Sequence, residues 1–166
     1  MDADLRQHDD VQELMMLLAT LLAIASPDKL PPGEPVPPPA SEEAAVLAPV
    51  NAVFAALAAR DGQAALAQVD MRGNVTSVDA SGKAVTRSWA EWAAGLKPGP
   101  QRYEERMPNP AVEIDGDVAM VWGFYTFAID GKLHHCGADH FSLVRADGRW
   151  KVLNLAWSSR TEGCGS

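Results

Sequence analysis

The sequence predicts an α+β domain, in which helices come first and an antiparallel sheet follows. Three consecutive strands can be traced from Asp117 to Ser159, joined by turns at Asp130-Gly131 and Asp147-Gly148. Asp-Gly tolerates the positive φ angles that two-residue hairpin turns require. The strands are rich in aromatic and β-branched residues, which suit a half-buried sheet. Because helical patterns precede these strands, an α+β plan follows.

Composition and charge limit the class of protein. The chain has 166 residues, of which 47% are hydrophobic and 22% charged, which suits one globular domain with a substantial core. Its net charge of −8 argues against nucleic acid and anionic membrane surfaces, since both select basic patches. The acidic excess otherwise serves solubility. No apolar run approaches the roughly 20 residues that span a bilayer, so no transmembrane span is expected.

Residues 1–25 form a signal-like or N-terminal hydrophobic segment. An acidic start precedes an apolar run at residues 14–25, which ends in Ala-Ile-Ala before Ser26. The run has the length and the small-residue ending of a signal peptide, although the charge before it is wrong. Translation from Met15 or Met16 would explain that charge. We expect a periplasmic or secreted protein; the alternative is a cytoplasmic one whose hydrophobic segment docks on the domain or on a partner.

A proline-rich linker is expected at residues 26–40, because seven of the twelve prolines fall between Pro27 and Pro39. Proline fixes φ and removes a backbone donor, so this segment favours an extended spacer. The folded domain is expected at residues 41–160, followed by a short tail at residues 161–166.

The domain begins with a long helix. Ser41 is an N-cap candidate, and acids in the next two positions suit the helix dipole. Apolar residues then recur at helical spacing, at Leu47, Val50, Phe54 and Leu57. Pro49 either kinks this helix or marks its first turn, and Gly62 ends it. Shorter helices are expected at 63–69 and 88–96, and shorter strands at 75–78, 84–86, 103–107 and 112–114.

The order of elements and three segments resemble the nuclear transport factor 2-like superfamily, also called SnoaL-like or ketosteroid isomerase-like. The segments are VFAALAARDG at 53–62, SWAEW at 88–92 and GADHFSLVRADGRWKV at 137–152. The closing WKVLNLAWSSRTEGC is similar to bacterial members labelled lumazine-binding. The resemblance implies a cone-shaped curved sheet that wraps the long helix and encloses a pocket, without metal or cofactor. It leaves function open, because the superfamily holds isomerases, dehydratases, cyclases and non-enzymatic binding domains.

Strand register predicts which side chains face the pocket. If Asp130-Gly131 is the whole loop, Ile129 pairs with Lys132 and Trp122 with Asp139. Alternation then places one set on the pocket face: Met120, Trp122, Phe124, Thr126, His135, Asp139 and Phe141. Aromatic walls with a few polar groups are typical of a site for a small apolar or aromatic ligand. Phe54 of the long helix is expected to join them.

The opposite face of the same strands is expected to be the interface of a homodimer. It would carry Tyr125, Phe127, His134, Cys136 and His140. This face is apolar enough to predict pairing with a second subunit, and the resemblance also implies dimerisation through the sheet.

Asp139 is the candidate polar contact. An acid in an apolar pocket has a raised pKa, and a protonated carboxyl can donate a hydrogen bond to a ligand. The segment ADHF resembles the ketosteroid isomerase strand that carries an oxyanion-hole aspartate, but Val53 replaces the tyrosine of that hole. Ser77 occupies the position of the general base, with Asp79 two residues on, so steroid isomerase activity is not expected. Alternatively, Asp139 bonds the Trp122 indole or the backbone and only shapes the pocket.

The last strand offers two further candidates. A plain hairpin at Asp147-Gly148 puts Asn154 on the face of Asp139, whereas one bulged residue in that turn brings Trp157 there instead. Core packing is the alternative role for Trp157.

The HHCGADH run at 134–140 does not predict a metal site, because neighbouring side chains point to opposite faces and zinc needs about four convergent ligands. Cys136 and Cys164 fit one disulfide if the protein is exported, and two thiols if it is cytoplasmic.

The leading hypothesis is therefore a small-molecule-binding domain with an aromatic pocket and one buried acid. The alternative is a cofactor-free isomerase or dehydratase, with Asp139 as hydrogen-bond donor and Asp79 or His135 as base. A third possibility is a dimerising interaction module without a ligand.

Overall fold

The computed structural model describes residues 40–164. The signal-like segment at 1–25 and the proline-rich linker up to residue 39 lie outside the described residues, as do the last two residues of the tail. The chain divides into two units, Met1–Pro35 and Val36–Ser166. All helices and strands named below belong to the second unit.

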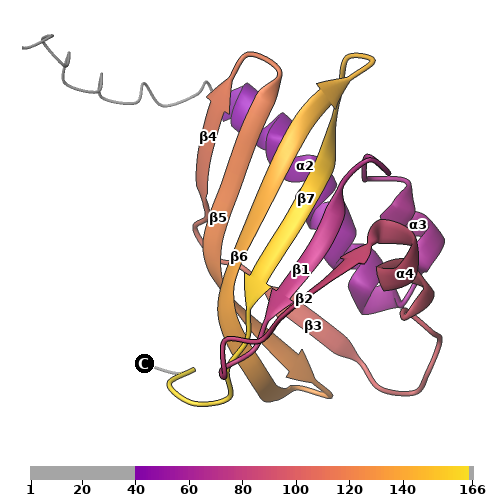
Figure 1. The fold of residues 1–166 in the computed structure, drawn as a ribbon, viewed down its shortest axis with the longest axis vertical. Coiled ribbons are helices and arrows are strands. Elements are labelled where there is room, and N and C mark those ends of the chain that lie inside the picture. The colour runs from indigo at the N-terminus through magenta and orange to yellow at the C-terminus, as the bar shows by residue number, and fades with distance from the viewer. Residues whose placement is uncertain (1–39, 165–166) are drawn as a thin grey trace, which may run out of the picture. The chain divides into compact units, whose positions relative to one another are not determined.

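Three helices and seven strands make up the described part of the chain (Figure 1). In chain order they are α2 (Ala40–Ala59), α3 (Gly62–Leu66), β1 (Asn74–Val78), β2 (Ala84–Ser88), α4 (Trp89–Ala94), β3 (Tyr103–Arg106), β4 (Ala111–Asp115), β5 (Val118–Ile129), β6 (Lys132–Ala146) and β7 (Arg149–Ser158). The α+β prediction is confirmed.

The strands form one sheet in the order β2-β1-β7-β6-β5-β3, and β4 also pairs with β5. The pairing of β1 with β7 is parallel, and all the others are antiparallel. Both β3 and β4 use the free edge of β5, at opposite ends of that strand. The chain between them crosses Gly123, where a Cβ atom would lie 2.7 Å from Met107 Cγ, so a larger residue would force the Met107 side chain to shift.

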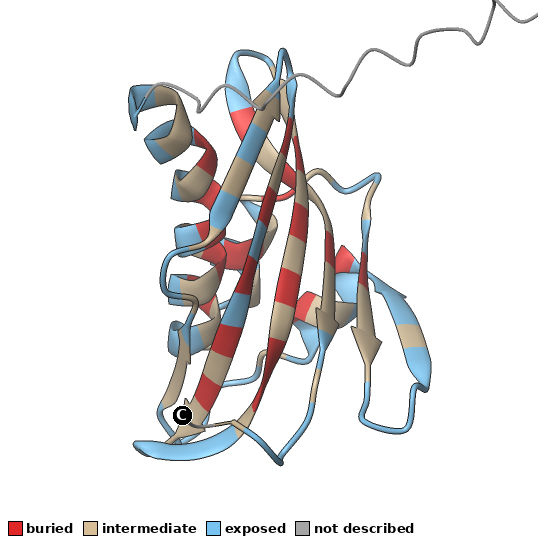
Figure 2. Ribbon diagram, turned by 90° about the vertical axis from the view of Figure 1, so that its left-hand side faces the viewer, coloured by how far each residue is buried: buried red, intermediate tan, exposed pale blue. Residues whose placement is uncertain are grey.

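Helix α2 covers one face of the sheet (Figure 2). Its buried side chains include Val46, Val50 and Val53, which pack in one core with Phe141 and Leu143 of β6. Pro49 lies inside the helix, which continues through it. By length and composition alone α2 would suffice to cross a membrane, but a core helix passes the same test, so α2 is weak evidence for a span.

Both Asp-Gly turns form as predicted. Asp130 and Gly131 have φ angles of 52° and 77°, Asp147 and Gly148 have 51° and 72°, and Ile129 pairs with Lys132. All four φ angles are positive, as the two-residue hairpin turns that match strand twist require.

The predicted register beyond the first turn is wrong, because β6 contains a bulge. Phe127 pairs with His135, while the next residue of β5, Ala128, pairs with Leu133, so His134 is the extra residue. A shift of one residue moves every side chain of a strand to the other face. Beyond the bulge, Asp139 therefore pairs with Gly123 instead of Trp122.

The shift exchanges the two faces of β5. Tyr125 and Phe127, which were expected on the outer face, point toward α2 and are 2% and 8% exposed. Trp122 and Phe124, which were expected in the pocket, lie on the outer face and are 40% and 62% exposed. Both faces of β5 are aromatic, so hydrophobic alternation alone does not distinguish the two registers.

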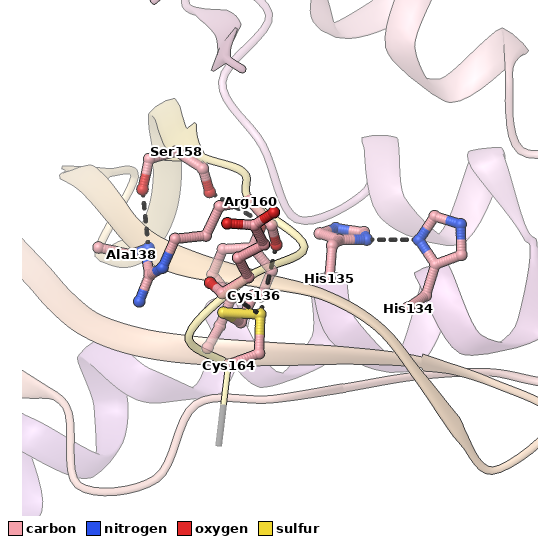
Figure 3. The surroundings of a disulfide bond; sticks show 9 residues. His134, His135, Cys136, Ala138, Ser158, Arg160 and Cys164 are labelled. Carbon is pink, nitrogen blue, oxygen red and sulfur yellow. Dashed lines mark hydrogen bonds between the residues drawn. A yellow bond between two sulfur atoms is a disulfide. The ribbon is translucent and has the colours of Figure 1, made fainter. Parts of the chain in front are cut away.

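A disulfide joins Cys136 of β6 to Cys164 of the tail (Figure 3). The tail is also held by two backbone hydrogen bonds between Cys136 and Arg160, each 2.9 Å long. The tail covers Cys136, which is only 3% exposed although it belongs to the outer face of the sheet. Of the two states left open for the cysteines, the disulfide is the one present.

Candidate functional site

A cavity of about 170 Å³ lies between α2, α4 and the inner face of the sheet. Five aromatic side chains line it: Phe54, Trp92, Tyr125, Phe127 and Trp157. Aliphatic side chains from α2 and β7 complete the apolar wall: Val53, Leu57 and Leu155. Only three lining residues carry ionisable polar groups apart from the tyrosine, namely Glu105, His135 and Asp139. An apolar wall with few polar groups is the usual make-up of a small-molecule site.

Asp139 lies on β6 beside this cavity and is 2% exposed. Its Oδ2 atom is buried and has no hydrogen-bond partner among the described residues. Burial raises the pKa of Asp139 to about 7, and a hydrogen bond from Glu105 limits the rise. A buried polar atom without a partner is uncommon and costly, so Asp139 is poised to accept a hydrogen bond from a molecule in the cavity.

Glu105 of β3 is the carboxyl group that meets Asp139. Burial raises its pKa well above the usual range, and the nearby charge of Asp139 raises it further. Two neighbouring carboxyl groups in an apolar site resist ionising together, because each negative charge disfavours the other. Burial raises the pKa of both groups, and Glu105 is the one that keeps its proton and donates toward Asp139. The site thus holds a carboxylic acid and a carboxylate side by side.

Sequence reasoning missed Glu105, although a signal was present. Strand β3 reads Tyr-Glu-Glu-Arg, and alternation places Tyr103 and Glu105 on one face. Tyr103 packs its ring 5.3 Å from that of Phe127 on the inner face of the sheet. An aromatic residue two positions before an acid therefore indicated an inward-facing carboxyl.

Tyr125 contributes its ring to the cavity wall, but its hydroxyl is not free to bind a ligand. Its hydroxyl donates to the backbone oxygen of Ser158 at 3.0 Å. Burial raises the pKa of Tyr125, and the charges of Asp139 and Glu105 raise it further, so the phenol stays protonated. Gly137 makes this contact possible, because any Cβ there would overlap the Ser158 carbonyl oxygen and press on the Tyr125 ring.

His135 lines the cavity as predicted and is neutral at pH 7. Burial lowers its pKa, and the neighbouring His134 lowers it further. The Nδ1 atoms of the two rings lie 2.9 Å apart, and one of them donates to the other (Figure 3). The ring of His135 also packs against Phe127, with centroids 4.8 Å apart.

Four of the predicted site residues lie in the cavity wall: Phe54, His135, Asp139 and Trp157. Trp157 reaches the wall through a second bulge, since Ser142 pairs with Asn154 but Leu143 pairs with Val152, which leaves Leu153 extra. The bulged alternative for β7 is therefore the one found, although the bulge lies within the strand and not in the turn. Asp139 and Trp157 are direct cross-strand partners.

The other predicted residues lie elsewhere. Trp122 and Phe124 are on the outer face because of the bulge at His134, so neither lines the cavity, and Trp122 does not bond Asp139. Phe141 is fully buried in the core, with its ring 5.6 Å from that of Phe54 in an edge-to-face contact.

Asn154 and Asp79 instead form hydrogen bonds that stabilise the backbone outside the cavity: Asn154 at the start of β1, and Asp79 in the β1–β2 turn. The Asn154 side-chain oxygen accepts from the backbone N–H of Asn74 at 3.0 Å. The Asp79 carboxylate accepts from the backbone and hydroxyl of Ser81 and from the backbone of Lys83 in the β1–β2 turn. The hydrogen bond from the Ser81 hydroxyl contributes most to lowering the pKa of Asp79. Asp79 is exposed and outside the cavity lining, so it is not placed to serve as a base there.

Within residues 40–164, no group of three or more His, Cys, Asp or Glu side chains is arranged to hold a metal ion.

Solved structures share this fold. An NTF2-like protein from Shewanella baltica OS155 has a TM-score of 0.60 and 14% identity, covering 76% of this chain and all of the other. A protein with a cystatin-like fold from Nostoc punctiforme PCC 73102 has a TM-score of 0.60 and 12% identity, covering 76% and 97%. An NTF-2-like protein from Silicibacter pomeroyi DSS-3 has a TM-score of 0.57 and 16% identity, covering 72% and 97%. At these identities the likeness establishes the fold alone.

The fold is thus that of the nuclear transport factor 2-like superfamily, as the sequence predicted. Residues 41–158 match a family model described as "Putative lumazine-binding", and the chain belongs to that family. No curated protein matches the chain.

Proposed function

We propose that this domain binds a small ring-bearing molecule in the cavity between α2, α4 and the sheet, with Asp139 as its polar contact. The observation that supports this most strongly is the unpartnered Oδ2 atom of a carboxyl group that is 2% exposed and borders an aromatic cavity. If no ligand bound in this cavity, the Oδ2 atom would stay buried without a hydrogen bond, which destabilises the folded protein. The family description, which refers to ligand binding, agrees with this proposal.

Native mass spectrometry of the full chain tests the proposal. Wild-type protein is expected to retain a small molecule that Asp139→Asn loses. Asp115→Asn is the matched control, because Asp115 is exposed at the end of β4 and the substitution removes the same charge outside the cavity. Retention by all three proteins would mean that the molecule is bound elsewhere. If no molecule is retained and the tryptophan fluorescence does not respond to ring compounds, the binding proposal fails.

A second candidate function is acid–base catalysis without a cofactor. It is favoured by one observation, the two carboxyl residues Glu105 and Asp139 that line the same apolar cavity, where burial raises the pKa of both. An ionised Asp139 is able to take a proton from a bound substrate, while the protonated Glu105 is able to donate one. His135, which the sequence analysis proposed as a base, lies in the same cavity wall, and its own imidazole is neutral.

The retained molecule decides between binding and catalysis. If a ligand is found, single-turnover measurements with deuterium-labelled ligand would show whether the protein exchanges or moves a proton. Catalysis predicts exchange in wild type and at least a hundredfold loss in Asp139→Asn, as expected for a general acid or base. Exchange at the same rate in both proteins would exclude this pair as the catalyst.

We also propose that the protein forms a homodimer through the outer face of the sheet. Trp122 and Phe124 are exposed there with their rings 5.0 Å apart, and exposed aromatic clusters often mark interfaces. Sedimentation of wild type and Phe124→Ser tests this, with Phe127→Ser on the inner face as the contrast. A monomeric wild type would refute the dimer.

Finally, we propose that the protein is exported. The Cys136–Cys164 disulfide supports this, since such bonds persist mainly in oxidising compartments. N-terminal sequencing of protein recovered from periplasmic and culture fractions tests it. An uncleaved protein confined to the cytosolic fraction would contradict it.

A further inference from the structure

We propose that the molecule recognised by this cavity is a cation: a single-ring amine or amidine whose charged N–H groups are bound by the carboxylate of Asp139. This inference rests on the proposed binding function and adds the charge of the ligand to it.

The first support is the charge of the cavity wall. Two of the lining residues, Glu105 and Asp139, are acids, and none of the described lining residues is Lys or Arg. Two arginines lie nearby but outside the lining. Arg60 stacks its guanidinium 3.8 Å from the centre of the Tyr103 ring and donates to the Lys97 carbonyl, while its buried Nε atom has no partner among the described residues. Arg160 belongs to the tail beyond β7, and its charge acts on Tyr125. An anionic ligand would meet a carboxylate here without a compensating cation.

The second support is the hydrogen-bonding capacity of the carboxyl pair. Glu105 directs its proton toward Asp139, and the buried Oδ2 atom of Asp139 has no partner among the described residues, so the pair presents acceptor capacity to the cavity. The Tyr125 hydroxyl is already used by the Ser158 carbonyl. A ligand that presents only acceptors would leave Oδ2 unpaired, whereas a charged N–H donor forms the stronger, charge-assisted bond.

The third support is the aromatic wall and its size. Phe54, Trp92, Phe127 and Trp157 present rings to the cavity, and aromatic faces attract cations in desolvated sites. The cavity volume of about 170 Å³ is close to the roughly 150 Å³ that accommodates a benzene ring in an engineered core. One ring with a short charged substituent therefore fills it.

Binding of a cation should depend on pH through Asp139. The titratable groups that face it are Glu105 from β3, Tyr125 from β5 and His135 from β6 itself; the lining residues from α2, α4 and β7 do not titrate. His135 stays neutral and Tyr125 stays protonated at neutral pH. Because a bound cation stabilises ionised Asp139, binding releases a proton below pH 7, and affinity falls as Asp139 becomes protonated.

Three probes of nearly equal size test the charge of the ligand: benzamidine, benzamide and benzoate, which are a cation, a neutral amide and an anion. Binding to the full chain is followed at pH 8 by tryptophan fluorescence and calorimetry. We expect benzamidine to bind at least about tenfold more tightly than benzamide, and benzoate to bind most weakly. The preference for benzamidine should shrink by about tenfold between pH 7 and pH 5.5, with proton release visible as a buffer-dependent heat.

Two variants of the carboxyl pair, Asp139→Asn and Glu105→Gln, and one control, Asp115→Asn, test whether the pair causes the preference for the cation. Asp139→Asn should bind benzamidine and benzamide alike, while Asp115→Asn should keep the wild-type preference. Glu105→Gln keeps the carboxylate and should also keep a preference for the cation, which guards against a folding defect in the first variant. Circular dichroism checks that each variant is folded.

Each outcome has a distinct meaning. If benzamide or benzoate binds as tightly as benzamidine, the cavity is a binding site but the inference about charge is wrong. A cation preference that survives in Asp139→Asn also refutes it. If none of the three probes binds, the inference fails, whereas the proposed binding function fails only if native mass spectrometry also finds no retained molecule.

Discussion

The two halves of β6 use the same face of one strand in opposite ways. Toward the β6–β7 turn, Phe141 and Leu143 are fully buried and pack directly against α2. Toward the β5–β6 turn, the same face carries Asp139 and His135 and borders a cavity. One half is a solid core that supplies stability, and the other, the hollow half, contributes two polar side chains to the wall of an otherwise apolar cavity. The strand can sustain the hollow half because the solid half, the flanking strands and the disulfide hold it in place.

The largest effect is expected from emptying the solid half. Phe141→Ala removes a fully buried ring that packs edge-to-face on Phe54, and it should lower the free energy of unfolding by about 4 kcal/mol. Phe127→Ala, in the hollow half, should cost about 1–2 kcal/mol less, because its ring already borders empty space. Urea unfolding measures both. Equal losses would mean that the two halves are equally well packed.

Opening the disulfide should be the next largest effect. Cys136→Ser releases the tail from the hollow half and removes a cross-link between residues 28 positions apart. For a loop of that length the free energy of unfolding should fall by about 3.5 kcal/mol. Cys164→Ser should cost the same amount, and wild type in reducing buffer should match both. A loss in only one of the variants would point to packing of that residue and not to the cross-link.

Neutralising the buried acid should stabilise the protein in a pH-dependent way. Asp139 has a folded-state pKa of about 7 against 3.8 for the free side chain, so the folded state binds more protons in this interval. The contribution of Asp139 to stability therefore falls as pH rises from about 4 to 7 and then levels off. Asp139→Asn should raise the free energy of unfolding by about 4 kcal/mol at pH 8 and by almost nothing at pH 4. Thermal melts across this range test it, and a pH-independent change would contradict it.

The smallest effect is expected on the outer face. Phe124 is 62% exposed, so Phe124→Ser should change the stability of the monomer by no more than about 0.5 kcal/mol. Unfolding is measured at several protein concentrations, because a dimer would make the effect depend on concentration. A loss above 2 kcal/mol at the lowest concentration would mean that Phe124 supports the monomer core.

The sequence was sufficient to predict the order of elements and both turns, because these depend on local signals. The Asp-Gly pairs sit where positive φ angles are needed. Ser88 and Glu91 form a capping box at the start of α4, which agrees with the predicted helix start at Ser88. Such contacts join residues a few positions apart, so they can be recognised without knowing the sheet.

The cavity was predicted only in part, because the side chains that line it depend on two β-bulges. These bulges cannot be recognised from the alternation of apolar and polar residues in the sequence. Trp122 and Tyr125 are equally suited to a buried face, so the position of His134 in the ladder decides which of them is inside. Asp139 was found because it is the one acid amid an apolar stretch. Its partner Glu105 comes from a strand far away in sequence, and their meeting depends on the pairing of β3 with β5.

The bulge at His134 bears on how the length of the chain varies among relatives. Removing His134 would leave Phe127 opposite His135 and Asp139 opposite Gly123, so the cavity wall would keep its composition. Removing a residue between His135 and Asp139 would instead turn the acid out to solvent. The tip of this hairpin is therefore free to gain or lose one residue during evolution. For a homologue whose hairpin has a different length, positions counted from the pair of Asp139 and Gly123 would keep the same face, whereas positions counted from the turn would not.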